Sequence, residues 1–186
     1  MKHCGTIAIF TILCAAPLCA GTVSLTTDPF DGSIAGMPGE TVGWGFTLTW
    51  NSDAEWMSVT SSALTFETNP SLGTYTDFVG LQGGPLPNYA LAPSTSWAEV
   101  FDAVTMQGLA SYQIALDAVP FAYDSGSLVV FFDTFDGNPL DGGLQTGSSS
   151  VAAPFAVAVA ATTVPEPSYV VLGCICILAS ALLRRR

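Results

Sequence analysis

The chain has 186 residues and a formal net charge of −11, and its charges are unevenly distributed. Residues 21–163 carry fourteen of the fifteen acidic side chains and no Lys, Arg, His or Cys, because the basic residues are Lys2, His3 and the arginines at 184–186. This composition excludes a Ser-His-Asp triad, a cysteine nucleophile, a lysine Schiff base and a histidine zinc site from that region. It also makes nucleic acid and anionic lipid headgroups poor partners, since both are bound through Lys and Arg.

The acidity of residues 21–163 raises the question of disorder. The region is nevertheless rich in aromatic and aliphatic residues and can bury enough apolar surface to fold as one domain. All five cysteines lie outside it, at Cys4, Cys14, Cys19, Cys174 and Cys176. No disulfide can therefore stabilise the domain, and its fold must depend on packing. We interpret the last two cysteines as small apolar residues of a helix, with palmitoylation as an alternative.

Residues 1–20 have the layout of a secretory signal peptide, with a basic start, an apolar run and a small residue at the expected cleavage site. We expect cleavage between Ala20 and Gly21. A lipoprotein is the alternative, but it requires a small residue before the acylated cysteine. Leucine precedes both Cys14 and Cys19. The mature chain is therefore predicted to begin at the exported domain.

Residues 41–50 give the clearest strand signal, because apolar side chains alternate with Thr and Gly over the whole segment, at Val42, Trp44, Phe46, Leu48 and Trp50. Further strands are predicted over 22–26, 57–66 with a break near Ser61, 75–79, 97–101, 109–116, 127–132 and 151–159. Clusters of Gly, Pro, Asn and Asp separate these segments, and no amphipathic helix is evident.

Seven or eight short strands over about 140 residues predict an all-β domain, an antiparallel β-sandwich of immunoglobulin-like kind, over residues 21–159. The stretch PGETVGWGFTLTW is similar to early strands of immunoglobulin-like bacterial surface domains. Residues 147–150 are expected to form a flexible loop. Residues 160–163 are expected to link the domain to the tail.

The pattern Asp-x-Phe-Asp-Gly occurs twice, at residues 28–32 and 133–137, each time after a predicted strand. The candidate calcium ligands are the carboxylates of Asp28, Asp31, Asp133, Asp136 and Asp141. Neither copy has the spacing of an EF-hand loop. Asp and Gly also favour tight turns, so turns without calcium are the simpler interpretation. No other cofactor is expected.

The four tryptophans raise the question of a sugar-stacking surface. Trp44 and Trp50 share one face of the strand over 41–50, which favours core packing. Trp56 lies beside Asp53 and Glu55 in a predicted turn and is the better candidate for an exposed aromatic that contacts carbohydrate. Trp97 falls in another predicted strand.

The last segment, residues 164–186, has three parts in a fixed order. Val164, Pro165, Glu166 and Pro167 come first, and the two prolines hold the backbone extended. Residues 168–183 follow without a charge and predict one transmembrane helix of roughly 24 Å, shorter than the bilayer core of about 30 Å. The chain ends in three arginines, which act as a membrane stop signal and stay cytoplasmic, at Arg184, Arg185 and Arg186.

An extended Val-Pro-Glu-Pro motif, a short apolar helix and a terminal arginine cluster resemble the PEP-CTERM sorting tail, also catalogued as the ice-binding protein C-terminal domain. The resemblance covers residues 164–186. It implies recognition of Pro165, Glu166 and Pro167 by an exosortase, a membrane-embedded sorting protease of Gram-negative bacteria that make exopolysaccharide. Ice binding does not follow from it, since the tail occurs on many unrelated domains. A plain C-terminal membrane anchor is the alternative interpretation.

Together these features predict a non-enzymatic surface or exopolysaccharide-matrix protein that is exported, held transiently in the inner membrane by its single helix, and then passed to a sorting protease. A calcium- or carbohydrate-binding module on the same sandwich is the alternative. Paired carboxylates leave a glycosidase as a third hypothesis.

Overall fold

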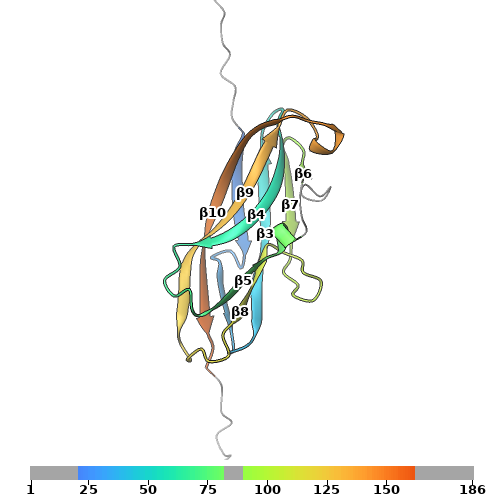
Figure 1. Ribbon diagram of the computed structural model, residues 1–186. Coiled ribbons are helices and arrows are strands. Elements are labelled where there is room, and N and C mark those ends of the chain that lie inside the picture. Colours follow the sequence, from blue (N-terminus) through green and yellow to red (C-terminus); the bar gives the residue numbers. More distant parts are fainter. Residues whose placement is uncertain (1–20, 82–89, 162–186) are drawn as a thin grey trace, which may run out of the picture.

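The computed structural model describes residues 21–81 and 90–161 (Figure 1). The predicted signal peptide, the Val-Pro-Glu-Pro motif, the apolar run and the terminal arginines lie outside these residues. Within the described ranges, none of the helices has the length and apolar character needed to cross a bilayer.

Two five-stranded sheets pack face to face and form a β-sandwich. The first sheet has the order β1-β3-β8-β5, with β7 also paired to β3; its strands are β1 (Thr22–Asp28), β3 (Thr41–Asn51), β5 (Gly73–Asp77), β7 (Thr95–Glu99) and β8 (Ala110–Ile114). The second has the order β2-β10-β9-β4-β6; its strands are β2 (Ser33–Gly36), β4 (Trp56–Thr65), β6 (Ala90–Leu91), β9 (Tyr123–Phe135) and β10 (Gln145–Val159). The described helical elements are two single turns, α1 (Phe78–Leu81) and the 3₁₀ helix η2 (Pro139–Asp141).

The core lies between the sheets and is organised around β3. The alternation predicted for this strand is confirmed, because Trp44, Phe46, Leu48 and Trp50 are all buried. Trp44 makes edge contacts with Tyr112 of β8 and Phe155 of β10, at ring centroid distances of 6.5 and 5.9 Å. Such edge-to-face pairs add to the stabilisation that comes from burying the rings.

Trp44 also connects the two sheets through its polar edge. Its indole Nε1 donates a hydrogen bond of 2.8 Å to the carbonyl oxygen of Gly32, directly before β2. Since a buried indole N–H without a partner is costly, this bond fixes where the chain crosses from β1 to β2. β1 pairs with β3 in the first sheet, whereas β2 pairs with β10 in the second.

Most predicted strands are found in the structure, with differences that have physical causes. The break near Ser61 is a register shift between Val59 and Ser61 against β9. The strand expected over 75–79 ends at Asp77, where α1 begins. β2 and β6, with four and two residues, were not predicted, and β2 pairs with β10 in parallel, so the sandwich is not purely antiparallel.

The prediction of a flexible loop over 147–150 was wrong. These residues belong to β10 and pair with residues 131–134 of β9. Gly and Ser have little intrinsic strand preference, but the long partner strand supplies main-chain hydrogen bonds to them, and the serines face solvent.

The two ends of the sandwich carry different connections. The start of β1 and the loop between β9 and β10 lie at one end, whereas β10 finishes at the other, beside the β2–β3 turn and the β8–β9 loop (Figure 1). The main chain joins these elements, because Phe121 N donates to Val159 O and Ala160 N donates to Gly36 O.

Candidate functional site

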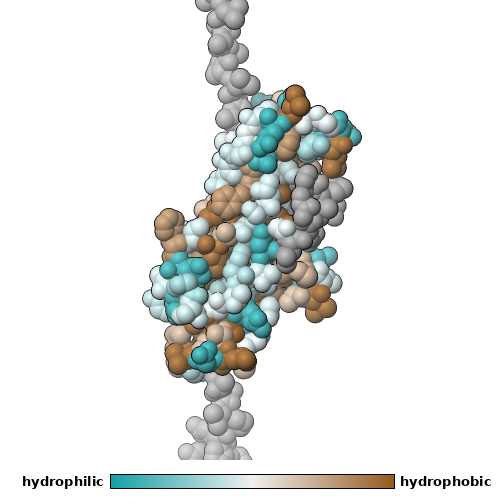
Figure 2. Space-filling model, in the orientation of Figure 1, coloured by the Kyte–Doolittle hydropathy of each residue, from teal (hydrophilic) through white to brown (hydrophobic). Residues whose placement is uncertain are grey.

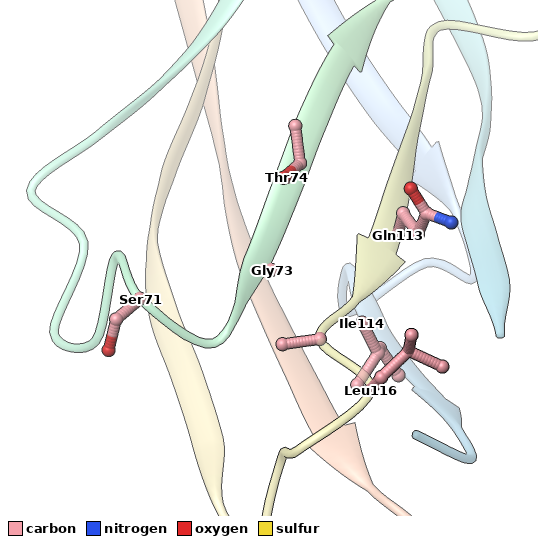
Figure 3. Close-up of a pocket in the computed structure, with 7 residues that line it drawn as sticks. Ser71, Gly73, Thr74, Gln113, Ile114 and Leu116 are labelled. Carbon is pink, nitrogen blue, oxygen red and sulfur yellow. The ribbon is translucent and has the colours of Figure 1, made fainter. Parts of the chain in front are cut away.

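Two adjoining hollows, of about 280 and 270 Å³, lie where the loop before β5 meets the end of β8. Figure 3 shows the first of them. We call them together the end groove. They share Ser71 and Ala115, and the other lining residues are Asn69, Leu72, Gly73, Thr74, Gln113, Ile114, Leu116, Asp117, Ala118, Val119 and Ala122.

The buried carboxylate of Asp124 holds one wall of the end groove in place. Asp124 is fully buried at the start of β9, and its Oδ1 accepts hydrogen bonds of 2.8 Å from the backbone N–H groups of Asn69 and Ser125. Thr68 Oγ1 also donates to Oδ1, at 3.3 Å, and Tyr112 Oη donates to Oδ2, at 3.5 Å. The loop that carries Asn69 and Ser71 is therefore fixed to the second sheet by a side chain from β9.

The pKa values of two groups near the Asp124 carboxylate, Tyr112 and Glu67, are raised. Burial raises the pKa of the Tyr112 hydroxyl, and the charges of Asp124 and Glu67 raise it further. Burial also raises the pKa of Glu67, with a second contribution from the charge of Asp124. Tyr112 is thus a neutral hydrogen-bond donor at physiological pH, and the Glu67 carboxyl binds its proton more tightly than a free glutamate does.

The floor of the end groove is the pairing of β5 with β8. Gly73 lies opposite Ile114, and Ala115 N donates a 2.9 Å hydrogen bond to Leu72 O. A Cβ atom at Gly73 would collide with the ring of Tyr112 and the carbonyl oxygen of Gln113. Glycine at this position therefore permits the close approach of the two strands.

The lining combines apolar side chains with polar groups that are almost all uncharged. Ser71, Thr74, Gln113 and Asn69 present hydroxyl and amide groups, and Ser71 Oγ donates to Asn69 Oδ1 at 2.9 Å. Asp117 is the one carboxylate in the lining. Hydroxyl and amide groups suit a neutral polyhydroxylated ligand, whereas a single carboxylate is half of the pair that glycoside hydrolysis uses.

The structure does not bring the candidate calcium ligands together. Asp31 lies near Ala156 of β10, because the carbonyl oxygen of the next residue, Gly32, accepts from Ala156 N. Asp133 of β9 lies opposite Ser148, which is also a residue of β10. Eight residues of strand separate the two positions, which corresponds to about 26 Å. Within the described ranges, no three His, Cys, Asp or Glu side chains lie close enough to hold a metal ion.

Four of these aspartates instead accept hydrogen bonds from their own turns or, for Asp133, from the paired strand. Asp31 Oδ1 accepts from Ser33 N at 3.0 Å, which lowers the pKa of that carboxyl, and Asp136 Oδ1 accepts from Leu144 N at 2.7 Å. Asp141 Oδ2 accepts from Asn138 Nδ2 at 2.8 Å, and Asp133 Oδ1 accepts from Ser148 Oγ at 2.6 Å. Asp28, the last residue of β1, lies opposite Gly45 of β3.

The tryptophans are placed largely as expected. Trp44 and Trp50 are core residues, and Trp97 packs edge-on against Phe46 at 4.6 Å between ring centroids. Trp56 is half-buried as the first residue of β4, opposite Phe135, so it is less exposed than the predicted turn implied. Glu55, next to it, accepts a hydrogen bond from Thr146 of β10.

No single stretch of the chain signals the end groove. Its walls come from residues 69–74 and 113–122, two segments that only the β5–β8 pairing brings together. The isolated polar residues Asp124 and Asn69 look like ordinary turn residues in the sequence.

Comparison with known proteins gives only distant structural likenesses. No protein-family model and no curated protein matches the chain. Among solved structures, the chain is similar to a PapD-like domain of human CEP192, with a TM-score of 0.32, 10% identity, and coverage of 87% of this chain and 100% of that one. It is also similar to the CooA pilin subunit of enterotoxigenic Escherichia coli, with a TM-score of 0.31, 9% identity, and coverage of 75% and 99%. At these identities and scores, nothing about activity or partners transfers to this chain.

Proposed function

We propose that the protein is a non-enzymatic surface or matrix component of a Gram-negative bacterium, exported, anchored transiently in the inner membrane, and sorted through residues 164–186. The observation that carries the proposal is the order of Val-Pro-Glu-Pro, an uncharged stretch of sixteen residues and three terminal arginines. The uncharged stretch and the arginines alone would serve a plain anchor equally well, so the motif in front of them is the part that favours sorting.

The organisation of the domain agrees with an extracellular role. Its strand order, β1-β3-β8-β5 in one sheet and β10-β9-β4 in the other, corresponds to the ABED and GFC sheets of the immunoglobulin fold and supports an immunoglobulin-like sandwich. The residue types available over 21–163 leave few routes to catalysis, as the composition indicates. Such a domain suits presentation and binding.

The test of sorting uses the native host or another bacterium with an exosortase. Pro165, Glu166 and Pro167 are replaced together by alanine, and Thr162 and Thr163 are replaced by alanine in a matched control. We expect the wild type and the control to lose residues near the C-terminus, as measured by intact mass. The triple variant should remain in the inner membrane with Arg186 still attached. Wild-type protein that retains Arg186 and stays in the inner membrane would refute sorting and leave the plain anchor.

The end groove favours a second candidate function, carbohydrate binding. Its neutral hydroxyl and amide lining, from Asn69, Ser71, Thr74 and Gln113, suits a polysaccharide better than a charged ligand. Exopolysaccharide of the producing organism is the ligand to test. Binding that is weakened at least fivefold by Gln113→Ala and left unchanged by Gln145→Ala, at the far end of β10, would support the site. Equal affinity for both variants would refute it.

A further inference from the structure

Exposed apolar side chains gather at the end of the sandwich where β10 finishes. Leu116 and Phe121 are 86% and 81% exposed, and three further members of the group are also exposed. We call this group the terminal patch and define it as Met37, Leu116, Val119, Phe121 and Tyr123. Figure 2 shows apolar colour at this lower end, around a small hydrophilic area.

The hydrogen bonds show that the members of the terminal patch surround the last residues of β10. Phe121 N donates to Val159 O, and Val159 N donates to Ala122 O. On the other side, Gly39 N donates to Ile114 O, and a Cβ atom on Gly39 would come within 2.6 Å of the Leu116 side chain. The β2–β3 turn and the β8–β9 loop therefore form a single apolar rim.

Phe121 is an unusual residue for its place in the backbone. Ala122 N donates to Val119 O, which closes a turn with Pro120 second and Phe121 third, and Phe121 has a φ of 66°. This is the pattern of a type II turn, whose third position normally carries Gly or Asn. A large exposed aromatic at positive φ is unfavourable for the fold alone. Phe66 is a second aromatic of this kind, with a φ of 58° and 88% exposure, so the case for Phe121 rests on its place in the terminal patch.

We propose that the terminal patch rests on the lipid bilayer and inserts Phe121, Leu116 and Val119 at the boundary between headgroups and acyl chains. Leu116 and Val119 also line the end groove, so this contact and polysaccharide binding in the groove exclude each other while the chain is anchored. This inference rests on the proposed anchoring of residues 168–183 in the membrane. Six residues, 162–167, separate the end of the described domain from that apolar run, and they span at most about 22 Å. The chain thus leaves the domain within the terminal patch and holds that patch close to the membrane surface.

The charges of the domain indicate whether electrostatic attraction or apolar burial drives the membrane contact. Glu40 and Asp117 lie among the apolar residues of the rim, and residues 21–163 contain no Lys, Arg or His. Attraction to anionic headgroups therefore cannot drive the contact, and apolar burial must do so. Tyr123, with a polar tip on an apolar ring, suits the headgroup level. The contact should be at least as strong on zwitterionic as on anionic lipid.

The experiment uses the full chain, purified from the membranes of a host without an exosortase and reconstituted in phosphatidylcholine vesicles with brominated acyl chains. Phe121→Trp reports on the terminal patch. Leu144→Trp is the matched control, because Leu144 is 71% exposed near the opposite end of the sandwich. The emission that each new tryptophan adds to the wild-type spectrum is then compared with and without bromine.

We expect bromine to quench the added emission of Phe121→Trp at least twofold more than that of Leu144→Trp, and to do so equally with and without 0.5 M salt. A chain that floats with the vesicles but shows equal quenching of the two variants overturns the membrane contact alone. A chain that fails to float overturns both the anchor and the contact. Quenching that requires phosphatidylglycerol and disappears in salt also overturns the apolar contact.

A second measurement separates this role from stability. Phe121→Gly removes the exposed ring and relieves the positive φ, so it should melt at the same temperature as wild type or higher. A melting temperature lowered by several degrees would show that the fold itself uses the ring, and it would overturn the argument from Phe121.

Discussion

Asp124→Ala should be among the most damaging substitutions of a single polar side chain in this domain. The change removes an acceptor at a fully buried position and orphans two donors, Asn69 N and Tyr112 Oη. Ser125 N is spared because it also donates to Thr68 Oγ1 at 3.1 Å. The two orphaned donors are the buried Tyr112 Oη and the partly buried Asn69 N, and at about 1–3 kcal/mol each they give a loss of roughly 2–6 kcal/mol.

Asp124→Asn is the matched comparison. The amide oxygen can still accept from Asn69 N, and the amide nitrogen can donate to the Tyr112 hydroxyl, so both groups keep a partner. We therefore expect this variant to lose less than about 2 kcal/mol. Tyr112→Phe should lose about 1 kcal/mol at most, since its 3.5 Å bond is long.

Urea unfolding of residues 21–161, followed by tryptophan fluorescence, measures all three variants. With an m-value of about 2 kcal/mol/M, the expected loss for Asp124→Ala lowers the midpoint by roughly 1–3 M. A midpoint within 0.3 M of wild type, on the order of the error of extrapolation, would refute the assignment of Asp124 as the residue that fastens the 66–72 loop. Equal losses for the Ala and Asn variants would show that the negative charge of the carboxylate matters, and that neither side-chain volume nor the hydrogen bonds an amide can make replaces it.

Three further predictions test the core and the charges. Trp44→Phe removes the 2.8 Å bond to Gly32 O and leaves space in the core, so it should cost about 2–4 kcal/mol in thermal unfolding. Gly43→Ala should cost about 1–3 kcal/mol, because its Cβ would meet the Phe101 ring and Ala110 O, whereas Gly137→Ala, with its closest atom at 3.7 Å, should be neutral. Glu67→Gln should raise the melting temperature at pH 7 but not below pH 4.5. Because the pKa of Glu67 is raised in the folded state, the wild type loses stability as the pH rises from 4.5 through that folded pKa. Glutamine does not ionise, so the variant should not lose this stability.

The sequence predicted those strands whose own residues carry the information. Apolar residues alternate with Thr and Gly over residues 41–50, and Trp44, Phe46, Leu48 and Trp50 of this set are the side chains of β3 that are buried in the core. β2 and β6 are too short to show a period, and they exist because β10 and β4 offer pairing partners. The 147–150 segment has the composition of a loop, but the length of β9 decided its structure. Pairing between distant segments decided each of these cases.

Contact between distant segments also limits which functional surfaces could be predicted from the sequence. The tail motif is contiguous, so it could be identified from its residues alone. The end groove joins residues 69–74 to 113–122, and the terminal patch joins the β2–β3 turn to the β8–β9 loop. Neither surface has a signature in any one stretch of the chain, and both follow from the strand order.

The lack of cations in residues 21–163 determines how the domain can bury its carboxylates. A buried carboxylate needs compensation, and where no Lys, Arg or His is present the donors must be neutral. Asp77, which is partly buried, accepts from Ser62 N at 3.0 Å and from Ser62 Oγ at 2.6 Å, and Tyr75 donates to that same Ser62 hydroxyl at 2.7 Å. Asp77 therefore ties the end of β5 to β4 in the opposite sheet, as Asp124 ties the 66–72 loop to β9. Both carboxylates bridge separate parts of the fold through backbone and hydroxyl donors, so added salt should weaken these contacts less than it relieves the repulsion among the exposed carboxylates.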